Sequence, residues 1–386
     1  MSRQSAMAPT ESRDGHSPER THATRHYTGR PMRRAFMAAC GGWIGLLAIF
    51  ALALAGCAQF GASSNTTSTY TGAVAHVSLA LDWTPNTNHT GIFVAQQLGY
   101  YRQHGIDLTL TPYSNSVAPE QLVATGKADF AISFPEALTP LRAQNEPLVS
   151  IAAIIQSNTS ALVSLKKSGL DSVAKLAGKR YASFGAPYEQ PVVAQVLSCG
   201  GATSTSYQNI SSAVLDPMNE VEQGQADFAW VYEGWEVIQA ERAGYQLNVF
   251  PLVDYCIPDY SSPVIITNQN LIQQHPDVIR RFLAATGEGY TYATQHAHDA
   301  ATMLIAGAPK GAFDDTGLVY ASQAYLSPRY AQGAACWGQQ SLVKWTDYPR
   351  FMYTHGAIQD ANGNPITTQP NYAAAFTNKF LPPCKS

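Results

Sequence analysis

The sequence lacks the motifs that mark the common catalytic classes. It has no Gly-x-Ser-x-Gly and no His-Glu-x-x-His, the signatures of many serine hydrolases and zinc proteases. Its six cysteines contain no Cys-x-x-Cys spacing, so we expect no metal site. Basic clusters are missing after residue 56, which argues against nucleic acid as a partner. We therefore expect a protein that is not an enzyme and has no cofactor.

The chain begins with a segment typical of export. Arg33 and Arg34 precede an uncharged run over 35–58, which contains the letters LAGC at 54–57. A basic start, an apolar middle and small residues at the exit mark an export signal. The letters LAGC resemble the lipobox of bacterial lipoproteins, which implies cleavage after residue 56 and lipidation of Cys57. The alternative is an uncleaved anchor, because the run is long enough to span a bilayer.

The leader leaves two further points open. Arg33 and Arg34 also resemble a twin-arginine export signal, and Met32 is an alternative first residue. Without residues 1–56, the chain has 17 Lys and Arg against 24 Asp and Glu and is therefore mildly acidic. Residues 57–73 are small and polar with no apolar period, which predicts a flexible tether.

From residue 74 onward, short β-rich runs alternate with helical patterns. The runs lie at 74–81, 106–114, 128–134 and 148–156, and the helical patterns at 90–104, 118–127 and 137–145. This order predicts an α/β fold with βαβ units and a largely parallel sheet. The same order starts again near residue 160, and the letters LVATGKADFAISFPEAL are echoed by EVEQGQADFAWVYEGWE. The echo indicates an internal structural repeat.

The repeat predicts two lobes joined by two crossings, near 156–163 and 258–264. We assign 74–160 to the first part of lobe 1, 161–258 to lobe 2, and 259–386 to the return to lobe 1 with C-terminal helices. Ligands of open parallel sheets bind beyond the carboxyl ends of the strands, so we expect a ligand between the lobes.

Four cysteines remain in the exported part besides Cys57. Disulfides are the default for an exported chain, and four cysteines allow three pairings. We favour Cys199–Cys256 and Cys336–Cys384, because each pair then falls within one proposed structural unit.

Three segments carry a resemblance to a known family. They are LDWTPNTNHTGIFVAQQLGYYRQHGIDL at 81–108, YEGWE at 232–236 and PDYSSPVIITNQNLIQQHPDVIRRFLAAT at 258–286. Together they resemble substrate-binding proteins of ABC transporters, in the ThiY-like branch that binds thiamine pyrimidine precursors. The resemblance covers nearly all of 74–358. It implies the two-lobed type II periplasmic-binding-protein fold with two hinge crossings.

The same resemblance implies a function and its partners. The ligand would be a small heteroaromatic molecule in the interlobe cleft, such as formylaminopyrimidine or hydroxymethylpyrimidine, and the partners an ABC permease and its ATPase. The protein would be a monomer, held by its lipid anchor at the outer face of the cytoplasmic membrane. Alternatives are riboflavin, a sulfonate or another nitrogen heterocycle as ligand, or an exported enzyme or sensor similar to pyrimidine synthases. The synthase branch uses a lysine after the third strand, and the segment 131–135 has none.

The first lobe supplies candidate ligand contacts after two of its strands. Trp83 matches a family position that stacks on a flat ring. Asn86, Asn88 and His89 would add hydrogen bonds, although Asn-rich turns before helices are also common caps. After the third strand, the resemblance and topology place Ser133 and Glu136 at the cleft. Glu136 would equally suit the first turn of a helix.

The second lobe supplies the opposite wall. Its candidates are Tyr188 and Glu189 before one helix, and Tyr232, Glu233 and Trp235 after the strand that repeats Ala-Asp-Phe-Ala. A carboxylate that accepts from an exocyclic amine, with an aromatic ring above, suits an aminopyrimidine. Glu189 would repel a phosphate group at this helix start. Trp235 could instead be a core aromatic.

Overall fold

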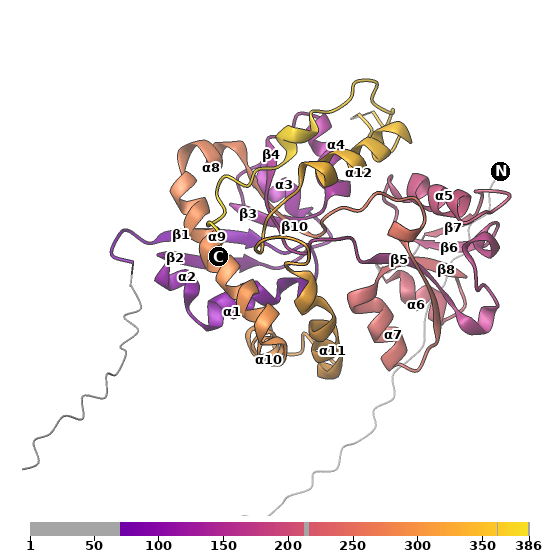
Figure 1. The fold of residues 1–386 in the computed structure, drawn as a ribbon, viewed down its shortest axis with the longest axis horizontal. Coiled ribbons are helices and arrows are strands. Elements are labelled where there is room, and N and C mark those ends of the chain that lie inside the picture. The colour runs from indigo at the N-terminus through magenta and orange to yellow at the C-terminus, as the bar shows by residue number, and fades with distance from the viewer. Residues whose placement is uncertain (1–69, 212–215, 361, 385–386) are drawn as a thin grey trace, which may run out of the picture. The chain divides into compact units, whose positions relative to one another are not determined.

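The computed structural model describes residues 70–211, 216–360 and 362–384. The predicted signal at 1–56, the predicted lipidation site Cys57 and most of the predicted tether lie outside the described residues. Of the described helices, none is both long and apolar enough to cross a membrane. Two mixed sheets organise the described part of the chain (Figure 1), and we call each sheet with the helices packed on it a lobe.

Lobe 1 contains a five-stranded sheet in the order β2-β1-β3-β10-β4. Its strands are β1 (Ala75–Ala80), β2 (Ile106–Thr111), β3 (Phe130–Ser133), β4 (Leu148–Ala153) and β10 (Val264–Asn268). Its helices are α1 (Thr90–Gln97), α2 (Tyr100–Gln103), α3 (Pro119–Ala124), α4 (Pro135–Ala143), α8 (Gln269–Gln274), α9 (Pro276–Gln295), α10 (Ala297–Gly307) and α11 (Thr316–Leu326).

Lobe 2 contains a five-stranded sheet in the order β7-β6-β8-β5-β9. Its strands are β5 (Ser160–Leu165), β6 (Arg180–Ser183), β7 (Gln208–Ser211), β8 (Phe228–Tyr232) and β9 (Leu247–Pro251). Its helices are α5 (Glu189–Cys199), α6 (Pro217–Glu222) and α7 (Ile238–Arg242), with a π-helical turn, η4 (Glu233–Val237), ahead of α7.

The α/β class and the largely parallel strand order are confirmed, because four of the five strands in each sheet run in the same direction, but one strand in each sheet is reversed, which was not expected. In lobe 1, β10 runs antiparallel to β3 and β4, and in lobe 2, β5 runs antiparallel to β8 and β9. β5 and β10 are the strands by which the chain enters each lobe from the other one. A strand that arrives across the cleft runs opposite to strands built by βαβ units, so the crossings make both sheets mixed.

The predicted helix over 90–104 is divided in two. Gly99 adopts a left-handed conformation (φ 74°) between α1 and α2, which glycine tolerates because it has no Cβ. The core of lobe 1 lies under these helices, where the buried rings of Phe130 and Phe282 stack with centroids 4.0 Å apart. Phe282 belongs to the apolar face of α9, so the long helix is fixed directly on β3.

The two Ala-Asp-Phe-Ala repeats occupy equivalent positions. Phe130 of β3 pairs with Leu79 of the neighbouring parallel strand, and Phe228 of β8 pairs with Tyr181. The preceding aspartates act alike. The Asp129 carboxylate accepts from the backbone N–H of Ser78 on β1 (2.8 Å), and the Asp227 carboxylate accepts from that of Arg180 on β6 (2.9 Å). The repeated aspartate thus ties each strand to its parallel neighbour at the point where β3 and β8 begin.

Helix α12 (Leu342–Thr354) joins the segments that cross between the lobes. The Lys344 ammonium forms an ion pair with Asp259 at 2.8 Å and donates to the Gln156 carbonyl. Gln156 lies on the first crossing and Asp259 on the second. Asp259 also accepts from the backbone N–H of Asn158 at 2.9 Å. One cation therefore fastens both crossings to α12.

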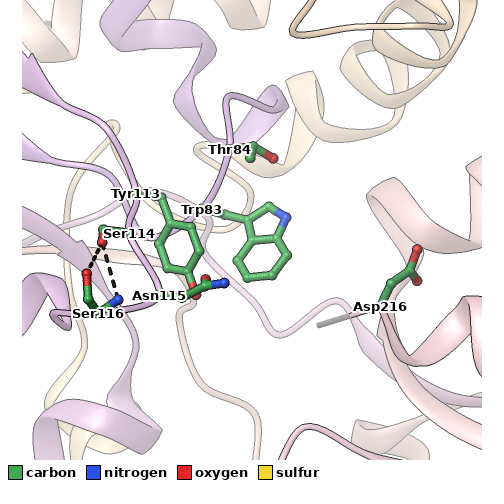
Figure 2. Close-up of a pocket in the computed structure, with 7 residues that line it drawn as sticks. All are labelled: Trp83, Thr84, Tyr113, Ser114, Asn115, Ser116 and Asp216. Atoms are coloured by element: carbon green, nitrogen blue, oxygen red, sulfur yellow. Dashed lines mark hydrogen bonds between the residues drawn. The ribbon is translucent and has the colours of Figure 1, made fainter. Parts of the chain in front are cut away.

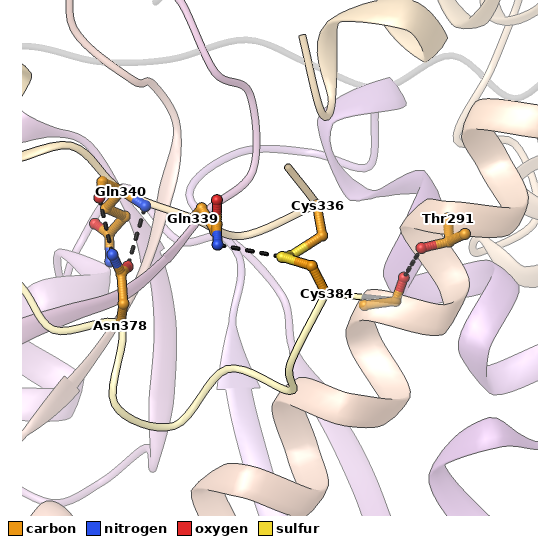
Figure 3. Close-up of a disulfide and its surroundings, with 7 residues drawn as sticks. Thr291, Cys336, Gln339, Gln340, Asn378 and Cys384 are labelled. Atoms are coloured by element: carbon orange, nitrogen blue, oxygen red, sulfur yellow. Dashed lines mark hydrogen bonds between the residues drawn. A yellow bond between two sulfur atoms is a disulfide. The ribbon is translucent and has the colours of Figure 1, made fainter. Parts of the chain in front are cut away.

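The structure pairs the cysteines as Cys199–Cys256 and Cys336–Cys384, the pairs favoured from the sequence. Figure 3 shows the second disulfide beside Gln339, whose amide donates to the Cys384 sulfur at 3.2 Å. The next residue, Gln340, exchanges two hydrogen bonds with Asn378. The disulfide thus anchors the segment that leads into α12.

Candidate functional site

The loop after β1 is held by its own side chains. His89 is completely buried, and its Nδ1 accepts from the backbone N–H of Asn86 at 3.2 Å. Its Nε2 therefore carries the proton and donates to Asp82 at 2.8 Å. The Asn86 side chain accepts from the backbone N–H of Asn88 at 2.9 Å. The Asp-Trp-x-Pro-Asn-x-x-His motif thus forms a turn that is held by its own hydrogen bonds. Both ring nitrogens of His89 are occupied by hydrogen bonds within this turn.

This locked loop presents Trp83 to an open cavity of about 770 Å³. Figure 2 shows the Trp83 indole beside the phenol of Tyr113, with the ring centroids 4.8 Å apart. Asp216, at the start of α6 in lobe 2, lies across the cavity from them. The lining is completed by Thr84, Ser114, Asn115 and Ser116. Two adjacent rings with neutral polar groups around them can hold a flat polar molecule.

Ser133 and Glu136 lie where β3 passes into α4. The Ser133 hydroxyl is buried and donates to Glu120 at 2.6 Å, so it serves α3 rather than the cavity. Glu136 is 2% exposed, and its Oε1 accepts from the Tyr260 hydroxyl. Its Oε2 is buried with no hydrogen-bond partner. Burial raises the pKa of Glu136 to about 7, against the lowering effect of the Tyr260 hydrogen bond.

Four tyrosines from four segments surround this carboxyl, and we call them the tyrosine shell. They are Tyr188 before α5, Tyr232 at the end of β8, Tyr260 on the second crossing and Tyr348 on α12. Burial and then the negative charge of Glu136 raise the pKa of each hydroxyl, so all four stay neutral. The rings of Tyr260 and Tyr348 stack at 3.7 Å. Tyr232 is 40% exposed and gives the shell an edge at the surface.

Aromatic rings connect the tyrosine shell across the two lobes. Phe134, next to Glu136 in the chain, meets Tyr188 edge-on at 6.4 Å. Tyr188 in turn meets Trp230 of β8 edge-on at 6.0 Å. The buried Trp230 Nε1–H has no hydrogen-bond partner. The wall formed by these rings therefore contains both apolar surface and an unused donor.

Glu189 is placed differently from the expectation that it faces the ligand. It is 3% exposed, and its two carboxylate oxygens accept from the Tyr181 and Ser183 hydroxyls and from the backbone N–H groups of Phe184 and Ala186. The distances run from 2.6 to 3.2 Å. The carboxylate therefore fixes the turn that presents Tyr188.

The turn η4 rests on lobe 1 instead of lining the cavity. Trp235, which we expected opposite Trp83, lies against Phe313 at 6.3 Å in an apolar cluster with α10 and α11. Glu233 accepts from the Tyr325 hydroxyl of α11 at 3.2 Å. The expected stacking role of Trp235 does not match this position, because the π-helical turn directs the side chain to the interlobe contact. Of this segment, Tyr232 remains at the site as a member of the tyrosine shell.

Sequence reasoning missed three residues of the site. Tyr113 follows β2 in the letters TPYSNS, a polar turn after a strand that could have drawn attention. Glu236 accepts from the backbone N–H of Tyr232 at 3.0 Å, and burial raises its pKa to about 7. Tyr348 lies more than eighty residues beyond the second crossing, and no local signal ties it to the cleft.

The charged side chains of the site are acidic. Asp216 lines the cavity and Glu136 lies inside the tyrosine shell, and no Lys, Arg or His is among the residues that line the cavity or surround Glu136. Asp82 adds a third carboxylate, close enough to raise the pKa of Tyr113 after burial has done so. Within the described ranges, no group of three or more His, Cys, Asp and Glu side chains is arranged to hold a metal ion.

Comparisons with known proteins place this chain among relatives of both kinds, binding proteins and synthases. It is 27% identical over 230 residues to the formylaminopyrimidine-binding protein of Halalkalibacterium halodurans, which covers 59% of this chain and 69% of that protein. It is 26% identical over 240 residues to the 4-amino-5-hydroxymethyl-2-methylpyrimidine phosphate synthase of Legionella pneumophila, which covers 61% and 74%.

Solved structures and a family profile give the fold and the family. The alkanesulfonate-binding protein of Xanthomonas axonopodis pv. citri, bound to MOPS, superposes with a TM-score of 0.60 at 12% identity, covering 79% of this chain and 99% of that one. The chain therefore has the α/β fold of periplasmic binding proteins. The profile of the family described as NMT1/THI5 like matches residues 86–300, more than half of the sequence. The protein belongs to the NMT1/THI5-like family.

Proposed function

We propose that this protein is the extracytoplasmic substrate-binding component of an ABC importer for a small heteroaromatic molecule. The ligand is a thiamine pyrimidine precursor such as formylaminopyrimidine or hydroxymethylpyrimidine. The observation that carries the proposal is the Trp83–Tyr113 pair beside an interlobe cavity. The pair offers ring faces to a planar ligand, and the name of the Halalkalibacterium halodurans relative supplies the ligand class.

The charges around the cavity support a neutral or cationic ligand. A sulfonate, nitrate or phosphate group needs cationic or N–H donors to offset its charge. Here the nearby acidic side chains are Asp82 and Asp216, and negative charge there would repel an anion. An aminopyrimidine has amino N–H donors and ring-nitrogen acceptors instead. The fold similarity to an alkanesulfonate-binding protein therefore does not extend to a sulfonate ligand in this proposal.

The proposed function includes export and anchoring. The letters LAGC at 54–57 support cleavage and lipidation at Cys57, which would hold a monomeric binding protein at the outer face of the cytoplasmic membrane. The permease and its ATPase would then meet the ligand-bound lobes. Mass spectrometry of the protein from membranes tests this step, since an unmodified Cys57 in the mature chain contradicts it.

The binding function is tested by calorimetry on the chain purified without lipidation, as Cys57→Ser. The panel contains formylaminopyrimidine, hydroxymethylpyrimidine, riboflavin, taurine and nitrate. We expect a pyrimidine to bind with Kd near 1 μM or tighter, about −8 kcal/mol. Trp83→Ala removes stacking and apolar contact together and should cost about 2 kcal/mol, roughly thirtyfold in Kd. Trp83→Phe should keep most of the affinity, and Tyr70→Ala, outside the cavity, should keep all of it.

A second candidate function follows from the relatives named as synthases. An enzyme of this kind would release a new pyrimidine product, whereas a binding protein returns its ligand unchanged. The strand-end segment 131–135 contains no lysine, which favours binding over synthesis in our proposal. Mass spectrometry of the ligand recovered after long incubation separates the two: a changed mass identifies an enzyme, and an unchanged ligand identifies a binder.

A further inference from the structure

The carboxyl of Glu136 is incompletely satisfied at a buried position. Its Oε1 accepts from Tyr260, while its Oε2 has no partner although the side chain is 2% exposed. Other buried carboxyls of the described chain have partners: Glu120 accepts from Ser133, and Glu189 accepts four hydrogen bonds. A buried polar atom without a partner is unfavourable by about 1–3 kcal/mol. The Oε2 atom of Glu136 is therefore available to form a hydrogen bond with a ligand.

The surroundings of Glu136 belong to both lobes. Phe134 and Glu136 come from lobe 1, whereas Tyr188 and Tyr232 come from lobe 2. Trp230 meets Tyr188 edge-on at 6.0 Å and contributes a second buried polar atom without a partner, its Nε1–H. Tyr232, 40% exposed, connects this interior to the surface. Unused polar atoms from opposite lobes therefore lie along one aromatic wall. Tyr232, whose pKa is raised by burial and then by the charges of both Glu136 and Asp82, connects this wall to the loop that presents Trp83.

The chemistry of these groups specifies the edge of the ligand. An amidine-type edge, in which a ring nitrogen stands next to an amino group, offers one acceptor and one donor side by side. A neutral carboxyl donates from Oε2–H to the ring nitrogen, and an ionised carboxyl accepts from the amino group or from a protonated ring nitrogen. In both forms Oε1 remains free to accept from Tyr260.

Resting on the proposed function, we propose that Glu136 is the residue that selects the ligand, through a hydrogen bond from its Oε2 to the ring-nitrogen and amino edge of an aminopyrimidine. The bond involves one proton, which lies either on Glu136 Oε2 or on the ring nitrogen. Its transfer forms a carboxylate and a pyrimidinium ion, and no other bond changes.

The protonation of Glu136 fits this role. Burial raises its pKa to about 7, and the groups that face it from the surrounding segments are the hydroxyls of the tyrosine shell, not cations. At neutral pH the group therefore exists in both forms and can match either form of the ligand edge. An ordinary exposed glutamate, ionised above pH 5, would offer an acceptor alone.

The test compares two ligands and two variants by calorimetry at pH 7. The probes are 4-amino-5-hydroxymethyl-2-methylpyrimidine and its carbocyclic analogue (2-amino-4-methylphenyl)methanol, which lacks both ring nitrogens. The wild-type chain should prefer the pyrimidine by at least about tenfold, the value of one buried hydrogen bond to a polar partner. Glu136→Gln keeps an N–H donor of the same shape and should keep the preference. Glu136→Leu should reduce it to less than about threefold.

The outcomes separate the two proposals. Retained pyrimidine preference in a folded Glu136→Leu protein overturns the role of Glu136 while the binding function stands. If the wild-type chain binds neither probe, the proposed ligand class fails and this inference fails with it. Thermal unfolding of each variant monitors folding, and Glu136→Met, which also lacks a hydrogen-bonding oxygen, takes the place of Glu136→Leu if that variant does not fold.

Discussion

Glu136 and Glu189 are two buried glutamates in the first turn of a helix that follows a strand, yet their surroundings are opposite. Glu189 accepts four hydrogen bonds, two from β6 and two from the turn before α5, and Glu136 accepts one, from Tyr260. Both side chains are at most 3% exposed. Equal burial thus hides a difference in function. The hydrogen-bonding capacity of Glu189 is used by the fold, whereas Glu136 keeps one oxygen that can bind a ligand.

The difference teaches how to distinguish structural from binding groups in this site. His89 and Asn86 resemble Glu189, because the loop itself consumes their hydrogen-bonding atoms. Trp83 resembles Glu136 in keeping a part that its neighbours do not use, because its indole faces the cavity beside Tyr113. In both lobes, fully bonded side chains fix a turn, and that turn presents a less constrained residue to the cleft.

The largest expected effect is the loss of stability in Glu189→Ala. Four hydrogen bonds disappear at about 1 kcal/mol each, so we expect the free energy of unfolding to fall by about 4 kcal/mol. Urea unfolding followed by tryptophan fluorescence measures it. Glu136→Leu is the matched control and should change stability by about 1 kcal/mol or less, because it removes an unsatisfied buried carboxyl. Similar decreases in the free energy of unfolding of the two variants would contradict the distinction between a structural Glu189 and an unsatisfied Glu136.

The next effect concerns pH. The pKa of Glu136 is about 7 in the folded protein and 4.5 ordinarily, so between these values the unfolded chain binds fewer protons than the folded one. The contribution of Glu136 to the free energy of unfolding is therefore fully present below pH 4.5. It decreases as the pH rises towards 7, and the total loss is about 3 kcal/mol at most. Glu236 contributes a fall of the same sign.

The difference between wild type and Glu136→Gln isolates the contribution of Glu136 to this pH dependence. We expect the stability advantage of the wild-type chain over the variant to shrink between pH 5 and pH 7.5, as judged by urea unfolding at each pH. A constant difference across this range would show that Glu136 titrates as an ordinary carboxyl.

The smallest effect distinguishes two hydroxyl groups. Tyr260 donates to Glu136 and Tyr181 donates to Glu189, the latter at 2.8 Å. Tyr260→Phe removes the one hydrogen bond that Glu136 accepts from a side chain, whereas Tyr181→Phe leaves Glu189 three others. We expect Tyr260→Phe to cost about 1 kcal/mol more in unfolding free energy. It should also raise the pKa of Glu136 further, because the lost hydrogen bond lowers that pKa.

Much of the fold was predictable because it depends on local patterns. Alternating apolar runs gave the strands and the repeated Ala-Asp-Phe-Ala words gave the two lobes, since both depend on neighbours in the sequence. The antiparallel β5 and β10 were not predicted, because their direction follows from how the chain crosses between lobes. Gly99 stands where a helix C-terminal cap is expected, and the structure confirms it, although the pattern over 90–104 was interpreted as one helix.

The site was less predictable, because hydrogen-bond partners are a property of three-dimensional packing. Trp83 could be selected from its position just after a strand. The bonded state of His89 and Glu189 could not be seen, since both look like ligand groups until their partners are known. Trp235 was misplaced because a π-helical turn redirects its side chain.

The anchoring of α12 links the cleft to the chemistry of the surrounding compartment. The Cys336–Cys384 disulfide holds the segment of Gln340, whose side-chain oxygen accepts from Trp345 of α12 at 3.0 Å. The same helix carries Lys344 to both crossings and Tyr348 to the tyrosine shell. We therefore expect the cleft to be assembled fully only where thiols are oxidised, which ties ligand binding to the redox state of the surrounding compartment.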